Sequence, residues 1–154
     1  MPSFESARQV KHSAANMFDL VANVEDYPKF VPLCQTLRVR SRRINDAGDT
    51  VLIADMTVGY KAIRETFGSR VTLDRKNLTI LVEYIDGPFS SLQNRWNFID
   101  LGTPEAPLAK VEFFITYEFK SRTFAMLMGS MFDTAFRKFA AAFEARADVV
   151  YRQA

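Results

Sequence analysis

The chain has little of what metal-based or covalent chemistry requires. Its 154 residues include one cysteine, Cys34, and one histidine, His12. A single cysteine excludes an internal disulfide and any metal site built on several cysteines. A single histidine leaves no second imidazole for a His-based metal site, although His12 could act alone as an acid or base. We therefore expect a protein without a metal or a cofactor, in a reducing compartment.

Glycine and proline are scarce as well, at six residues each, and they stand mostly in turns. No glycine-rich phosphate loop, linker or internal repeat is present, so residues 1–154 are expected to form a single domain. The N-terminal segment has no apolar signal core, and no stretch is long enough to cross a bilayer. These absences favour a cytoplasmic location, with peripheral contact with the inner membrane left open.

The chain has almost no excess of charge of one sign, because 20 Lys and Arg residues are balanced by 18 Asp and Glu residues. Phosphate backbones require a concentrated basic field, so DNA is not expected as a partner. One local concentration exists: Arg38, Arg40, Arg42 and Arg43. These arginines could form a solvated outer face or a charged sheet edge. The alternative is contact with anionic lipid head groups or ribosomal RNA.

Aromatic side chains are abundant, with 14 Phe in a chain that is 48% apolar. Many of them fall in segments where apolar and polar residues alternate, which is typical of strands with one buried face. Alternation is clearest in residues 108–120. The predicted strands are 4–11, 36–44, 50–60, 63–73, 78–86, 92–101 and 108–120. Short turns join most of them, which indicates antiparallel neighbours.

Helices are expected on both sides of the main strand block. Ser13 can cap a first helix, and prolines at 28 and 32 allow at most a second short one. Residues 123–151 contain no proline and have an apolar stripe, which predicts a long C-terminal helix. The predicted fold is therefore α+β, a helix-grip fold in which a curved antiparallel sheet of six to seven strands wraps around that helix.

A sheet that curls around a helix leaves a space unless side chains fill it, and we expect an apolar cavity there. The inward faces of the predicted elements supply its expected lining: Phe67, Val71, Trp96, Phe98, Phe113, Ile115, Tyr117, Phe119, Met128, Met131, Phe132 and Phe139. Residues 124–132 are apolar almost all round the helix, which indicates a buried position or contact with an apolar partner.

Two polar residues share these inward faces, Glu65 and Asn94. Either could hold the polar end of an otherwise hydrocarbon ligand. The alternative for Glu65 is a β-bulge or a strand end that turns it to solvent. His12, at a strand-to-helix junction, is interpreted as a surface turn residue, and Cys34 as a plain buried or half-buried thiol.

Several motifs resemble one superfamily over nearly the whole chain. The motifs are Tyr27-Pro28-Lys29-Phe30-Val31-Pro32-Leu33-Cys34, Asp86-Gly87-Pro88-Phe89, Trp96-Asn97-Phe98 and Phe132-Asp133-Thr134-Ala135-Phe136. Together with the Ser13–Val21 segment they look like the START-like (SRPBCC) superfamily. Within it they resemble the branch of coenzyme Q-binding proteins and ribosome-association toxins.

The resemblance implies a non-enzymatic protein that binds ubiquinone or another polyprenyl lipid in an apolar cavity and supports respiratory electron transport. It equally implies an alternative, a toxin that binds the large ribosomal subunit and inhibits translation. A second alternative is a cyclase or hydrolase, because the same fold hosts such enzymes. That activity would need Glu65 or His12 as its acid or base.

Overall fold

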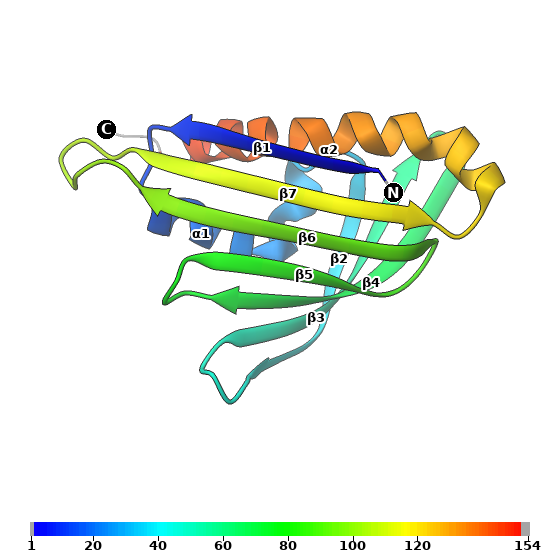
Figure 1. The fold of residues 1–154 in the computed structure, drawn as a ribbon, viewed down its shortest axis with the longest axis horizontal. Helices are drawn as coiled ribbons and strands as arrows, with labels where there is room; N and C mark the ends of the chain where they lie inside the picture. Colours follow the sequence, from blue (N-terminus) through cyan, green and yellow to red (C-terminus); the bar gives the residue numbers. More distant parts are fainter. Residues whose placement is uncertain (1, 152–154) are drawn as a thin grey trace.

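The computed structural model describes residues 2–151, which form one sheet, two α-helices and a 3₁₀-helix (Figure 1). The elements follow the order β1 (Ser3–Val10), α1 (Ala14–Ala22), η1 (Val24–Lys29), β2 (Cys34–Ile44), β3 (Thr50–Tyr60), β4 (Ile63–Asp74), β5 (Thr79–Asp86), β6 (Phe89–Asp100), β7 (Ala109–Phe119) and α2 (Arg122–Val150). The predicted α+β helix-grip fold is confirmed, and the second short helix, η1, is a 3₁₀-helix.

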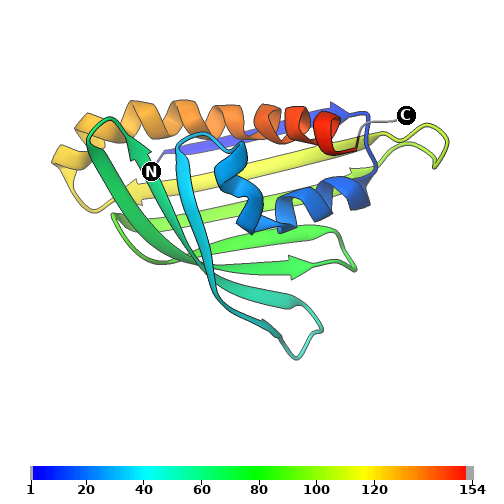
Figure 2. The same ribbon diagram turned by 180° about the vertical axis from the view of Figure 1, so that it is seen from behind.

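The seven strands form a single antiparallel sheet in the order β1-β7-β6-β5-β4-β3-β2. The strands from β2 to β7 follow one another along the chain, and each strand from β3 onward pairs with the strand before it. The first strand, β1, pairs instead with β7, and β2 is therefore the opposite edge. Figures 1 and 2 show α2 lying along β1 and β7, whereas β2, β3 and β4 turn away at a steep angle.

Both α-helices begin where a serine caps the backbone. The Ser13 hydroxyl accepts a hydrogen bond from the Asn16 amide at 3.1 Å, and Ser121 does the same for Phe124 at 3.1 Å. Such caps satisfy one of the amides that the first helical turn leaves without a partner. The predicted start of the first helix is confirmed, and α2 begins one residue earlier than predicted.

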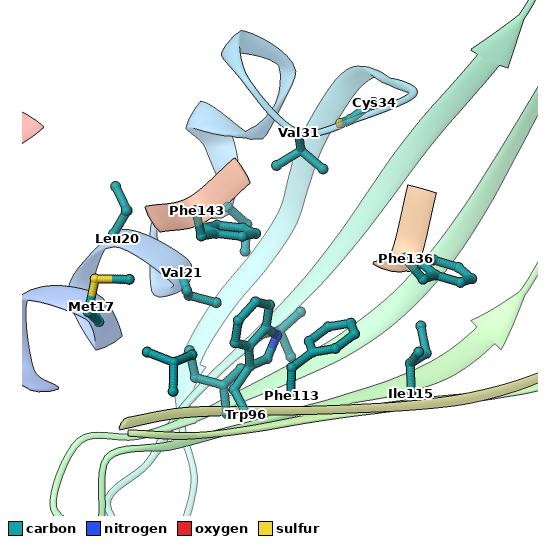
Figure 3. Packing of buried hydrophobic residues seen from close by; sticks show 14 of the residues in the cluster. Met17, Leu20, Val21, Val31, Cys34, Trp96, Phe113, Ile115, Phe136 and Phe143 are labelled. Carbon is teal, nitrogen blue, oxygen red and sulfur yellow. The ribbon is translucent and has the colours of Figure 1, made fainter. Parts of the chain in front are cut away.

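Aromatic side chains from both layers meet in the core between the sheet and the helices (Figure 3). Phe143 of α2 lies with its ring centroid 5.1 Å from that of Trp96 on β6, and Phe113 of β7 lies 4.7 Å from the same indole. Met17 and Val21 of α1 lie beside this cluster and are almost fully buried. The helix α1 therefore closes one end of the space between sheet and α2.

The last turns of α2 are joined to β1 by polar contacts. His12 is only 9% exposed, and its Nε2 lies 2.6 Å from Oδ1 of Asp148. Arg8 donates from Nε to Glu144 at 2.6 Å. The interpretation of His12 as a surface turn residue is wrong, because β1 runs alongside α2 and the residues after β1 therefore reach the last turns of the helix.

Candidate functional site: an apolar cavity under the C-terminal helix

An internal cavity of about 80 Å³ lies between α2 and the inner faces of β2 to β7. Its lining comes mainly from the part of the sheet that turns away from the helix: Leu37, Ala54, Met56, Val58, Phe67, Ser69, Val71, Val82, Leu92, Asn94, Trp96 and Ile115. From α2 it takes Phe132, Ala135, Phe136, Phe139 and Phe143, and from the segment after α1 it takes Val24, Tyr27, Pro32 and Leu33. Four of these residues carry polar N or O atoms in their side chains, namely Tyr27, Ser69, Asn94 and Trp96.

The Asn94 side chain is held by two hydrogen bonds. Its Nδ2 donates to the Phe114 carbonyl at 2.8 Å, and its Oδ1 accepts from Trp96 Nε1 at 2.9 Å. Asn94 is 9% exposed, and a buried amide without partners would cost free energy of folding. The residue therefore fixes the orientation of the Trp96 indole in the cavity wall. One amide hydrogen of Nδ2 remains beyond these two bonds.

The Tyr27 hydroxyl is engaged in the same way. It donates to the Val21 carbonyl at 2.5 Å, and burial, together with the nearby Cys34, raises the pKa of Tyr27 far above its ordinary value. Tyr27 is therefore a neutral part of the wall. Ser69, 7% exposed, places a small hydroxyl at the surface of the cavity.

Six of the twelve predicted cavity residues line this space: Phe67, Val71, Trp96, Ile115, Phe132 and Phe139. Met128 lines an adjoining crevice. The prediction is wrong for Phe98, Phe113, Tyr117, Phe119 and Met131, which face inward without reaching the cavity. The helix lies directly on β7 and β1, and there the large rings fill the space against one another. Phe119, for instance, stacks on Phe89 at 4.9 Å.

Sequence reasoning missed the contribution of β2, β3 and β5. Met56 and Val58 follow the period-2 pattern of a half-buried strand, and this signal identifies their inward face. The pattern gives no information about which part of the sheet the helix leaves uncovered. Ala135 belongs to the predicted apolar stripe of the C-terminal helix but not to the predicted cavity residues, although a small side chain facing the sheet leaves room for a cavity.

Glu65 lies at the crevice that adjoins the cavity. The pairing of β3 with β4 is unbroken here, with Val58 opposite Glu65, so the β-bulge alternative is wrong. The crevice is lined by Leu33, Val58, Gly59, Ile63, Glu65, Phe124, Met128 and Phe132, and it shares Leu33, Val58 and Phe132 with the cavity. Glu65 is half-buried, and no residue in 2–151 forms a hydrogen bond or ion pair with its carboxylate.

The crevice is closed in this structure. It has no room for a water molecule, and Phe124, Met128 and Phe132 of α2 pack across it. An apolar cavity of about 150 Å³ suffices for benzene, so the internal cavity is smaller than a single aromatic ligand needs. A larger apolar molecule therefore fits only if side chains around the cavity move.

The remaining titratable candidates lie outside the cavity. Cys34 is 7% exposed, burial raises its pKa to about 11, and its Sγ lies 3.6 Å from the Thr36 carbonyl. The interpretation as a plain buried thiol is confirmed. His12 lies at the far end of α2, so of the two acid–base candidates only Glu65 adjoins the cavity.

The four arginines lie on the edge strand β2, but they do not form one continuous strip. A register shift between Val39 and Ser41 reverses the alternation of the strand. Arg40 forms an ion pair with Asp55 at 3.0 Å, whereas Arg42, opposite the buried Leu52, forms one with Glu25 of η1 at 3.3 Å. No residue in the described part of the chain forms an ion pair with the remaining two, Arg38 and Arg43, and both are exposed.

Comparison with known proteins identifies the class. A family model described as polyketide cyclase / dehydrase and lipid transport matches residues 10–144, and the chain belongs to this family. Ribosome association toxin RatA of Escherichia coli (strain K12) is 32% identical over 151 residues, covering 98% of this chain and 90% of that protein. The mitochondrial coenzyme Q-binding protein COQ10 of Dictyostelium discoideum is 28% identical over 148 residues, covering 96% and 69%.

Solved structures agree with this assignment. The 18 kDa protein CC1736 from Caulobacter crescentus is 31% identical with a TM-score of 0.76, covering 99% of this chain and 100% of that one. A START superfamily protein from Mycobacterium smegmatis, 18% identical with a TM-score of 0.68 over 96% and 98%, shares the fold. The resemblance to ribosome-association toxins and coenzyme Q-binding proteins is thus confirmed, and the fold is the one that the START-like resemblance implies. No helix within residues 2–151 is long and apolar enough to cross a membrane.

Proposed function

We propose that the protein binds an apolar lipid, a quinone with a polyprenyl tail, between α2 and the sheet, without converting it chemically. The observation that carries the proposal is the apolar cavity under α2, which is continuous in its lining with the crevice at Glu65. The side-chain amide of Asn94 and the hydroxyl of Tyr27, both in the cavity wall, form hydrogen bonds within the protein. Relatives named for coenzyme Q binding support the same ligand class.

The polar end of the ligand has few contacts available. Ser69 and Asn94 line the cavity, Asn94 with one amide hydrogen beyond its two hydrogen bonds, and Glu65 lies at the crevice. Burying one five-carbon isoprene unit is worth about 4 kcal/mol relative to water, at roughly 0.8 kcal/mol for each carbon. A bilayer solvates the same tail equally well, so the tail contributes little to extraction from a membrane. Selectivity therefore depends on the head group and on the shape of the cavity.

Trp96 allows a direct test, because it is the only tryptophan and lines the cavity. Titration with a short-tailed ubiquinone should quench its fluorescence in a saturable manner, since a quinone bound against the indole accepts its excitation energy. A titration with the tail alcohol alone controls for displacement of the side chain. Quenching that rises linearly and never saturates would contradict the proposal.

A second candidate function rests on the exposed arginines of β2. Arg38 and Arg43 have no ion-pair partner among the described residues, and a relative at 32% identity is named ribosome association toxin. We propose contact with the large ribosomal subunit through this edge as the alternative, since exposed arginines bind RNA phosphates. Replacing Arg38 and Arg43 with serine should then release the protein from ribosomal fractions in a sucrose gradient. Lipid binding should be unchanged in the same variant.

A further inference from the structure

Apolar side chains are exposed where the β3–β4 turn meets the first turns of α2. Met126 is 86% exposed and Leu127 66%, and Tyr60 at the end of β3 is 37% exposed. Figures 1 and 2 both show this turn beside the start of α2, and Ile63 and Phe124 line one crevice between them. Apolar residues that gather in one exposed place commonly mark an interaction site.

The exposed charged residues at this place are all basic, and the half-buried Glu65 lies in the crevice next to them. We call segments 60–64 and 120–127 the docking end. It contains no acidic residue, and its basic residues are Lys61, Arg64, Lys120 and Arg122. All four are exposed, and none forms an ion pair with another residue in 2–151. The local charge of +4 contrasts with the near balance of the whole chain.

We propose that the docking end binds the surface of an anionic lipid bilayer. Met126 and Leu127 enter the boundary between head groups and acyl chains, and the four basic residues lie at the level of the phosphates. The Tyr60 ring, with Lys61 Nζ 5.2 Å from its centroid, suits the interface, where aromatic residues are enriched. Apolar insertion and attraction of Lys and Arg to anionic lipids are the two contributions that hold a peripheral protein at a membrane.

The same end of the molecule contains the closed crevice. Met126 and Leu127 lie on the outer side of the helical turns whose Phe124 and Met128 cover it. The contacts of α2 with Phe4, Arg8 and His12 involve its middle and last turns, so they leave these first turns held by apolar packing. A bilayer bound here would lie next to the side chains that cover the crevice. Docking itself requires no bound ligand.

The test is co-sedimentation of the full chain with vesicles that contain no quinone. Vesicles of phosphatidylcholine alone are compared with vesicles in which part of it is replaced by phosphatidylglycerol. The variant Met126→Asp/Leu127→Asp is compared with Val149→Asp/Val150→Asp, because these valines are exposed at the other end of the same helix. Thermal unfolding of both variants should match the original protein, since all four side chains are exposed.

We expect binding to the anionic vesicles, weakened by salt, and a loss of about tenfold in partitioning for the Met126/Leu127 variant. The Val149/Val150 variant should bind as the original does. Equal binding by the two variants, or no preference for anionic vesicles, would overturn the proposal. So would a dimer that forms without vesicles and is lost in the Met126/Leu127 variant, because a second copy would then occupy the surface. Quenching of Trp96 by a quinone tests the proposed function independently of this vesicle experiment.

Discussion

The indole Nε1 of Trp96 donates a hydrogen bond to Oδ1 of Asn94 at 2.9 Å, and both residues face the cavity from one strand. Two residues apart on β6, they share a face, and the amide group holds the ring against Phe143 of α2. The amide also donates to the Phe114 carbonyl on β7. Asn94 therefore links the position of the indole to the sheet.

Replacing Asn94 with alanine should lower the free energy of unfolding by about 1–3 kcal/mol, because it leaves the buried indole N–H without its partner. Trp96 emission should change at the same time, since the ring is no longer fixed. Asn97 provides the control: it is half-buried, and its Nδ2 lies 3.5 Å from Glu112. Asn97→Ala should cost under about 0.5 kcal/mol. Equal losses in the two variants would contradict this role for Asn94.

Filling the cavity should block ligand binding without unfolding the protein. Ala135 is 6% exposed and lines the cavity, so Ala135→Leu places three additional carbons in its 80 Å³. We expect quenching of Trp96 by the short-tailed quinone to weaken by about tenfold or more, and stability to change by less than about 1.5 kcal/mol. Ala145→Leu, on the exposed side of α2, should leave both unchanged. Undiminished quenching in the Ala135 variant would place the ligand elsewhere.

Much of the fold could be predicted from the sequence, because the period of the apolar residues is a local property. The alternation in residues 108–120 predicts β7, and the proline-free segment after residue 121 predicts α2. The position of the cavity depends on how far the sheet curls away from the helix. The sequence of a single strand contains no information about this curvature. Phe98 and Met56 both face inward, yet only Met56 reaches the cavity, because Phe18 of α1 packs on Phe98 with ring centroids 5.9 Å apart.

The arginines of β2 illustrate the same limit. Their spacing identifies an exposed strand, and its position as an edge agrees with the interpretation of a charged sheet edge. The register shift after Val39 places Arg42 on the side of η1, where Glu25 binds it. A bulge changes the facing of every later residue in a strand, and the alternation of arginine with other residues did not reveal it.

The pKa of Cys34 predicts a loss of stability at high pH. Burial raises it from the ordinary value of 9.0 to about 11 in the folded protein, so the unfolded chain loses this proton first. The stability that the protonated thiol contributes to the folded state is fully present below pH 9 and is lost as the pH rises toward 11. The free energies of unfolding of the original protein and of Cys34→Ala should therefore converge or cross between pH 9 and pH 11. Parallel pH profiles would show that the thiol ionises normally.

The same thiol should react slowly in the folded state. At pH 9 an ordinary thiol is about half ionised, whereas Cys34 is about 1% ionised, and only the thiolate is nucleophilic. Alkylation with iodoacetamide should therefore be at least about tenfold slower in the native protein than in denaturant. Since Cys34 is the only cysteine, mass spectrometry of the intact chain measures the rate directly. A native rate equal to the denatured rate would contradict its burial.

Asp148 should stabilise the end of α2 through His12. Asp148→Ala leaves the buried imidazole without its partner, and we expect a loss of about 1–2 kcal/mol in the free energy of unfolding. Amide exchange in the last turn of α2 should accelerate in the same variant. Asp46→Ala, in the exposed β2–β3 turn, is the control and should cost under about 0.5 kcal/mol. Unchanged exchange would show that the helix end is held by packing alone.

The most direct test of lipid binding is mass spectrometry of the organic extract from protein purified without detergent. We predict a quinone or another polyprenyl lipid in stoichiometric amount with the original chain, and its absence from Ala135→Leu purified in parallel. An extract without such a lipid, from protein that also fails to take one up when it is added, would contradict the account.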